Sequence, residues 1–335
     1  MTGAGEDKLA REVAISASLE ENGVKLRATS RAVSALDRLV GAALDWPAAF
    51  FEGAAGKKRL SDEIDAQLRR AQAAVAEAQI AGNQALGGVL IDSVLVEGAR
   101  KQKNVSGVAI EAVEAMKALP PPTSEETHSE GNQADDNLDS DWMNMFIRFA
   151  EDASSEQLQQ LWGRVLAGEV RKSGSFSRQT LRFIAELDTE TAATCEWAAN
   201  YTVDGIIPKF DQWNSGKPFA NMIDLQRLGL IDGVGGFGPN RKYTFDAAGN
   251  VTIQYGETAL HIEGDPGAEV KIGAIIITRL GKEVFSLLPS DPKAQILKDI
   301  ANHFPKDNIR KISFGRVVPE PGGLRFFTEE ILWPL

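Results

Sequence analysis

The chain has 335 residues, of which 43% are hydrophobic and 25% are charged, and its formal net charge is -11. This length suffices for two or three domains with ordinary hydrophobic cores. An acidic chain gains no general attraction to nucleic acid or to anionic membranes, so contact with either would need a local basic patch.

Cysteine usage and the hydropathy pattern both favour a cytoplasmic protein. The single cysteine, Cys195, excludes a disulfide framework within the chain. The N-terminus has no apolar segment of the kind found in signal peptides. Charged residues interrupt every long apolar run, so no membrane-spanning helix is predicted.

The first third of the chain is predicted to be helical. Residues 1–29 form a polar arm, and residues 30–119 form an elongated helical hairpin or bundle. In its first helix, apolar residues recur at three- and four-residue steps, as in Val33, Leu36 and Leu39. The glycines expected to break its last helix into pieces are Gly87, Gly88, Gly98 and Gly107. Its narrow apolar stripe is buried most easily against another copy, so we expect a homo-oligomer formed through residues 30–119.

A flexible acidic linker is predicted at residues 120–141. This segment holds three prolines and seven acidic side chains but no lysine or arginine. Such a composition buries too little apolar surface to fold alone. The linker is therefore interpreted as a solvated tether, with an acidic docking segment as the alternative.

The rest of the chain is predicted as a helical domain (residues 142–218) and an α+β domain (residues 219–335). In the helical domain Glu156 is positioned for a capping box, and Asp188 or Thr189 begins a later helix. After Ile231 the pattern changes to strand-like runs separated by tight turns, and then returns to helix. This order is typical of a winged-helix-like module with an enlarged wing. The fold class is therefore mainly α with an α+β C-terminal part.

One stretch resembles a known family. The matching residues are Trp162, Leu166, Ala167, Gly168, Glu169, Ser175, Ser177, Thr180 and Leu181. They are similar to the Trp…Leu-Ala-Gly-Glu…Ser-Phe-Ser…Thr-Leu signature of a bacterial family of unknown function. The stretches R-L-G-L-I at residues 227–231 and I-T-R-L-G-K-E-V-F at residues 277–285 also resemble abortive-infection alpha-type proteins. The resemblance covers residues 142–290 and implies a bacterial protein associated with phage defence, without established catalytic residues.

The same stretch is the first candidate site. Glu169 could accept backbone N–H groups at the start of the next helix, and Ser175 and Ser177 could cap that helix. In this interpretation the stretch is a corner between helices. The alternative is a ligand or partner surface, whose residues would be Glu169, Arg171, Lys172, Ser175, Ser177, Arg178 and Arg182.

Two further functions are kept open. Arg178 and Arg182 are one helical turn apart and project together, so a nucleic-acid-binding regulator could use them to contact phosphates. Asp265, Glu269 and Lys271 form the E-x-K pattern of metal-dependent nucleases, in which carboxylates hold Mg²⁺.

The leading hypothesis is a non-enzymatic interaction or assembly protein with a possible protein partner and a role in phage defence. No cofactor is predicted. No metal site is predicted apart from the nuclease alternative, because the three histidines lie far apart in the sequence.

Overall fold

A computed structural model gives the fold as two compact units, which divide between Ala185 and Glu186. We call them unit 1 (residues 1–185) and unit 2 (residues 186–335). The described residues are 31–39 except 33 and 37, then 66, 69, 70 and 73, then 85–118, 138–235, 238–288, 294–320 and 323–334. The predicted arm at 1–29 and most of the predicted linker lie outside the described residues.

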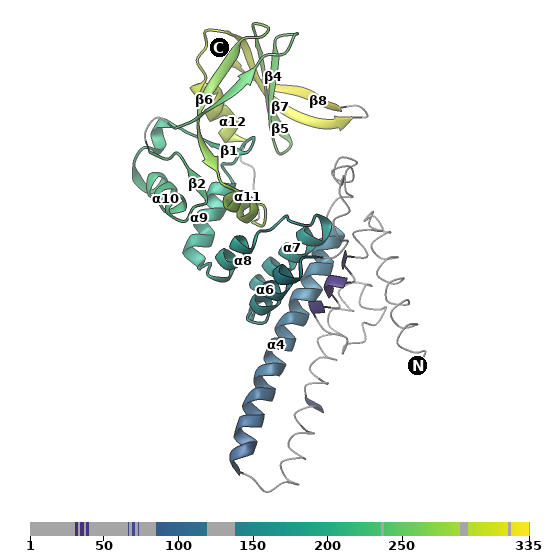
Figure 1. The fold of residues 1–335 in the computed structure, drawn as a ribbon. Coiled ribbons are helices and arrows are strands. Elements are labelled where there is room, and N and C mark those ends of the chain that lie inside the picture. Colours follow the sequence, from purple (N-terminus) through teal and green to yellow (C-terminus); the bar gives the residue numbers. More distant parts are fainter. Residues whose placement is uncertain are drawn as a thin grey trace. The chain divides into compact units, whose positions relative to one another are not determined.

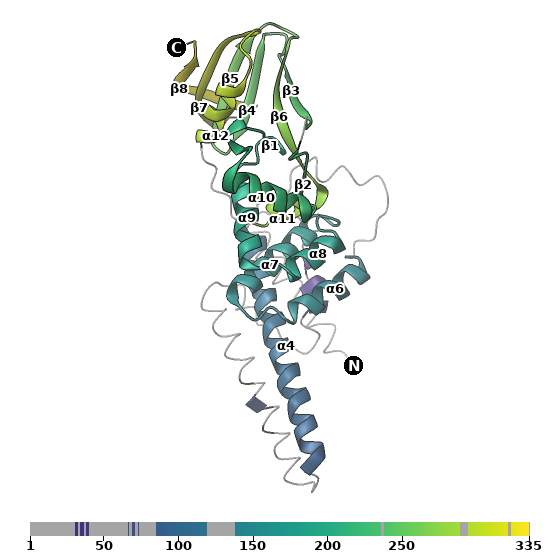
Figure 2. The same cartoon turned by 90° about the vertical axis from the view of Figure 1, so that its left-hand side faces the viewer.

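Unit 1 contains the long helix α4 (Ala85–Ala118), which runs along α6 and α7 and extends past them (Figures 1 and 2). The expected breaks at its glycines are wrong, because α4 is continuous over 34 residues. A glycine inside a helix costs only about 1 kcal/mol relative to alanine, which packing can offset. At Gly107 a Cβ would lie 2.3 Å from Oε1 of Gln159 on α7, so a larger residue there would displace the end of that flexible side chain.

Helices α6 (Ser140–Ala150) and α7 (Glu156–Arg171) both pack against α4. The α4–α7 contact is close, because a Cβ on Gly163 would meet the backbone nitrogen of Ala112 at 2.7 Å. Ser155 caps α7 by accepting a hydrogen bond from the Leu158 N–H at 3.3 Å. The predicted capping box is wrong, because Glu156 is the first residue of the helix and not the third, where such a box needs its carboxylate.

An aromatic cluster joins these helices. The rings of Trp142 and Phe146 stack with centroids 5.2 Å apart, and Phe146 meets Trp162 edge to face at 5.5 Å. All three side chains are buried. Aromatic pairs in these arrangements contribute about 0.5–1.5 kcal/mol each beyond the area they bury.

The described part of residues 31–39 is helical and belongs to the same unit. Leu36 and Leu39 are buried, which confirms the predicted apolar face at these positions. The Arg38 guanidinium donates to the carbonyl oxygen of Ser140 at 3.5 Å, which connects this helix to the start of α6. Described residues on both sides of the predicted linker therefore lie in unit 1.

Unit 2 combines helices with two four-stranded antiparallel sheets, as the α+β prediction expects. Its helical segments are α9 (Thr189–Ala199), the 3₁₀ turn η2 (Asp211–Trp213), α10 (Gly216–Arg227), α11 (Arg279–Phe285) and α12 (Gln295–His303). Asp188 caps α9 by accepting from the Thr191 N–H at 2.7 Å, which settles the predicted choice between Asp188 and Thr189.

The first sheet is organised around β6 (Glu269–Ile277). β1 (Ile206–Pro208) pairs with β6 opposite residues 274–276, and β2 (Ile231–Asp232) pairs with it opposite residues 276–277. β3 (Asn240–Thr244) pairs with the first half of β6. Thr278 then caps α11 and its hydroxyl donates to the Gly229 carbonyl oxygen at 2.6 Å, so the predicted return to helix follows the strand directly.

The second sheet has the strand order β4-β5-β7-β8. Its strands are β4 (Asn250–Tyr255), β5 (Thr258–Gly264), β7 (Ile309–Glu320) and β8 (Gly323–Trp333). α12 packs against β5 and β7, with the Lys298 ammonium 5.0 Å from the Phe314 ring centroid. β5 pairs with β7 only as far as Arg316, so the rest of β7 pairs with β8 alone and the hairpin extends past the sheet (Figure 1).

Of the helices that the structure describes, none combines the length and the apolar character needed to cross a bilayer.

Candidate functional site

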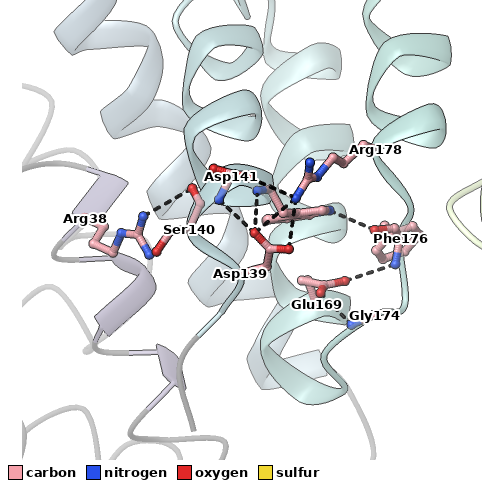
Figure 3. Close-up of polar contacts among 9 residues, drawn as sticks. Arg38, Asp139, Ser140, Asp141, Glu169, Gly174, Phe176 and Arg178 are labelled. Atoms are coloured by element: carbon pink, nitrogen blue, oxygen red, sulfur yellow. Dashed lines mark hydrogen bonds and ion pairs between the residues drawn. The ribbon is translucent and has the colours of Figure 1, made fainter. Parts of the chain in front are cut away.

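The predicted site surrounds the turn between α7 and α8 (Arg178–Ala185), which Figure 3 shows in close-up. Glu169, in the last turn of α7, is 3% exposed. Its Oε1 accepts a hydrogen bond from the Gly174 N–H at 2.6 Å, and its Oε2 accepts one from the Phe176 N–H at 3.0 Å. A carboxylate that accepts two backbone N–H groups fixes the path of the chain between two helices. The predicted role of Glu169 as a backbone acceptor is confirmed.

Phe176 also stabilises the turn, through its carbonyl oxygen and through its ring. Its carbonyl oxygen accepts a hydrogen bond from the Trp142 indole N–H at 2.7 Å, and its ring is buried. A Cβ on Gly168 would lie 2.6 Å from the Phe176 ring, so glycine allows the ring to lie against α7. The turn also contains Gly174, whose φ of +81° favours glycine.

The two serines of the predicted site have different roles. Ser177 precedes α8, and its Oγ accepts from the Thr180 N–H at 3.2 Å, which confirms the predicted cap. The Oγ of Ser175 donates to the carbonyl oxygen of Lys172 at 2.6 Å. The predicted capping of α8 by Ser175 is therefore wrong, because this hydroxyl satisfies a carbonyl after the end of α7.

Arg178 lies beside two carboxylates at the start of α6 (Figure 3). Its Nη2 is 3.1 Å from Oδ2 of Asp139 and 3.4 Å from Oδ2 of Asp141. Asp139 is also the N-cap of α6, and its Oδ1 accepts from the N–H groups of Asp141 and Trp142. The backbone N–H of Trp142, the N–H of Asp141 and the Arg178 guanidinium together lower the pKa of Asp139. These ion pairs are exposed, so each contributes little to stability.

The remaining cations of the predicted site are on the surface. Lys172 and Arg182 are exposed, and Arg171 is half-buried. Arg182 follows Arg178 by one turn of α8, as predicted, but the two carboxylates beside Arg178 neutralise part of the positive charge there. The structure thus brings Glu169, Ser175 and Ser177 into one turn and directs Arg178 toward α6.

The E-x-K residues lie on β6 and in the turn before it. The Glu269 carboxylate lies 3.3 Å from Nζ of Lys242 on β3 and 3.6 Å from Nζ of Lys271. Lys242, followed by Lys271, lowers the pKa of Glu269. Asp265 lies in the β5–β6 turn, where its carbonyl oxygen accepts from the Ala268 N–H at 3.0 Å. Within the described part of the chain, no group of three or more His, Cys, Asp or Glu side chains is placed to hold a metal ion.

Two parts of this arrangement are not predicted from the sequence. The composition places Asp139 and Asp141 in the acidic linker, although the pattern Asp-Ser-Asp before an apolar helix is a recognisable capping signal. The acceptor of the Trp142 indole N–H is not predicted either, although the indole N–H of a buried tryptophan needs one.

Comparison with known proteins identifies part of the chain. Residues 94–206 match the model of a family described as a protein of unknown function, DUF2806. The match contains the Trp162 to Leu181 motif, which confirms the resemblance to a family of unknown function, and it carries no information about phage defence. No curated protein matches the chain, and no solved structure does.

Proposed function

We propose that this protein is a non-enzymatic interaction protein whose unit 2 binds another polypeptide along the edge strand β8. The observation that carries the proposal is the exposure of the β7–β8 hairpin. Among the described residues, six large apolar side chains are strongly exposed, and four of them belong to this hairpin. They are Val318, Leu324, Phe327 and Ile331, with exposed fractions of 44%, 55%, 45% and 50%. Val318 and Phe327 lie on one face of the hairpin and Leu324 and Ile331 lie on the other, so both faces expose apolar side chains. Exposed apolar surface of this kind is typical of interaction sites.

The backbone of β8 supports the same proposal. β8 pairs with β7 on one side and ends the strand order of its sheet. The outer edge of such a strand presents N–H and C=O groups that can pair with a further strand. The opposite edge strand, β4, has exposed polar residues instead, namely Thr252 and Gln254. The two edges of one sheet therefore differ in apolar character, and β8 is the one suited to a partner.

The predicted ligand residues give less support to an enzyme or a ligand site. Glu169 and Ser177 are engaged in bonds that shape the α7–α8 turn. Arg178 is paired with carboxylates, which weakens the nucleic-acid alternative, and Glu269 lies between two lysines, which weakens the nuclease alternative. The winged-helix interpretation of residues 219–335, assembly through residues 30–119 and a role in phage defence stay predictions.

The test is photo-crosslinking in cells that produce the full chain. Phe327 on β8 is replaced by p-benzoylphenylalanine, and the matched control carries the same group at Thr252 on β4, which is also exposed. We expect a discrete protein adduct from position 327 and none from position 252. Equal adducts at both positions, or none at position 327, would contradict the proposal.

A further inference from the structure

A hollow lies between α9 and α10, two helices of unit 2 that pack against each other. Its volume is about 380 Å³, which is within the range of small-molecule sites. Glu190, Thr194 and Trp197 line it from one face of α9, because they follow one another at steps of four and three residues. Lys217 and Asn221 line it from the first two turns of α10. The hollow therefore combines an indole ring with a carboxylate, an ammonium group and an amide.

Trp197 gives the hollow a fixed aromatic wall. Its side chain is half-buried, and its ring centroid lies 5.2 Å from that of Tyr201 and 5.8 Å from that of Trp213. Tyr201 and Trp213 also meet edge to face, with their centroids 4.8 Å apart. These contacts hold the orientation of the Trp197 ring, so the surface that it offers to a ligand is formed in advance. A second aromatic ring is well suited to pack against such a surface.

The charged side chains that line the hollow have no partners of their own. Within the part of the chain that the structure describes, the side chains of Glu190, Lys217 and Asn221 form no hydrogen bond or ion pair. Glu190 and Lys217 thus carry opposite charges and line the same hollow without pairing with each other. A ligand that carries both a positive and a negative group can pair with each of them.

The start of α10 adds to the positive charge of Lys217. Ser215, the N-cap, makes no side-chain hydrogen bond to the helix, and the first turn contains no acidic residue. The N–H groups at the start of a helix favour an anion, and the first turn of α10 itself supplies none. Lys217 and this turn therefore suit the carboxylate of a ligand, whereas Glu190, in the first turn of α9, suits its ammonium group.

From these features we propose that the hollow between α9 and α10 binds a small zwitterion, namely a free amino acid or a dipeptide with an aromatic side chain. Lys217 pairs with the ligand's carboxylate, Glu190 pairs with its ammonium group, and its ring packs against Trp197. Glu190 repels a simple anion such as phosphate, and Lys217 repels a simple cation. The site is separate from β8, so it goes beyond the proposed function and does not rest on it.

Ligand analogues test the proposal on the full-length protein without any substitution. The probes are L-phenylalanine and the dipeptide L-phenylalanyl-glycine, and isothermal titration calorimetry measures their binding. The matched controls are phenylpropionate, which lacks the ammonium group, and phenethylamine, which lacks the carboxylate. We expect at least one zwitterion to bind with a Kd of about 1 mM or below, and each control to bind about tenfold more weakly or worse. The tighter of the two zwitterions identifies the ligand as an amino acid or a dipeptide.

Two conservative variants locate the binding in this hollow. Glu190→Gln and Lys217→Gln each remove one charge at an exposed position, and circular dichroism verifies that they keep the fold. We expect each of them to weaken the binding of the tighter zwitterion about tenfold. The matched control is Glu196→Gln, which removes an exposed charge from the same helix at a position outside the hollow and should leave the Kd unchanged.

Weaker binding of both single-charge analogues, together with weaker binding by both variants, supports the proposal. It is overturned if neither zwitterion binds, or if phenylpropionate or phenethylamine binds as tightly as the zwitterion does. It is also overturned if either Glu190→Gln or Lys217→Gln binds the zwitterion as tightly as wild type. None of these results depends on the crosslinking at position 327, so a failure here leaves the proposed function standing.

Discussion

The α7–α8 turn offers the sharpest test of whether the family motif is structural. In Glu169→Gln one carboxylate oxygen becomes an NH₂ group, so one of the N–H groups of Gly174 and Phe176 loses its acceptor. The lost bond is charge-assisted and buried, since Glu169 is 3% exposed. Loss of such a bond costs about 1.5–3 kcal/mol, and an unsatisfied buried donor adds to the cost. We therefore expect the free energy of unfolding to fall by about 2 kcal/mol or more.

The assay is urea denaturation followed by far-UV circular dichroism, with native-state hydrogen exchange of residues 172–178 as a local measure. The matched control is Glu156→Gln, which neutralises an exposed carboxylate in the first turn of the same helix and should cost only a few tenths of a kcal/mol. Increased exchange confined to residues 172–178 would locate the effect in the turn. If Glu169→Gln is no less stable than Glu156→Gln and the exchange of the turn is unchanged, the structural interpretation of Glu169 is refuted.

Three further predictions concern single positions. Gly168→Ala should lower the free energy of unfolding by about 1–3 kcal/mol, because the added Cβ clashes with the Phe176 ring. Gly98→Ala on α4 should raise it by about 0.5–1 kcal/mol in the same denaturation assay, because a Cβ there meets nothing within 4 Å. Folding lowers the pKa of Asp139, so the ionised carboxylate stabilises the folded state at pH values above its unfolded pKa of about 3.9. This contribution to the free energy of unfolding is lost as the pH falls through the pKa of Asp139 in the folded state. The difference in stability between wild type and Asp139→Ala should therefore shrink between pH 7 and pH 3. Burial raises the pKa of Cys195 to about 12, so a thiol reagent at pH 8 should label it only after unfolding in urea.

Local signals in the sequence predicted the elements of the fold well. Caps at Ser177 and Asp188 identify helix starts because their side chains bond N–H groups two or three residues away, which is information within a short window. The strands after Ile231 are predicted from strand-like runs separated by tight turns, which are local signals as well. Glu169 was also predicted as a backbone acceptor, because its partners lie within seven residues of it.

Contacts between distant segments were not predictable in this way. The packing of α4 on α7 crosses the acidic segment at 120–141, and composition alone indicated a domain boundary there. Arg178 and Asp139 are 39 residues apart, so no periodicity pairs them. Gly163 illustrates the same limit, because a glycine in a helical pattern lowers the helix propensity, and only the close approach of the α4 backbone at Ala112 explains its presence.

The faces of the sheet on which Glu329 and Glu330 lie cannot be predicted from the alternation of the sequence alone. Alternation alone assigns Glu329 to the face of Arg325 and Phe327, but it assigns Glu330 to the opposite one. The bulge at Glu329 reverses the assignment beyond it: Glu330 pairs with Phe314, and its carboxylate is bound by Lys298 of α12. One of two adjacent glutamates is thereby used within the fold by a lysine of α12. The other, Glu329, is bound by Arg316 of β7, so both glutamates form ion pairs within the fold.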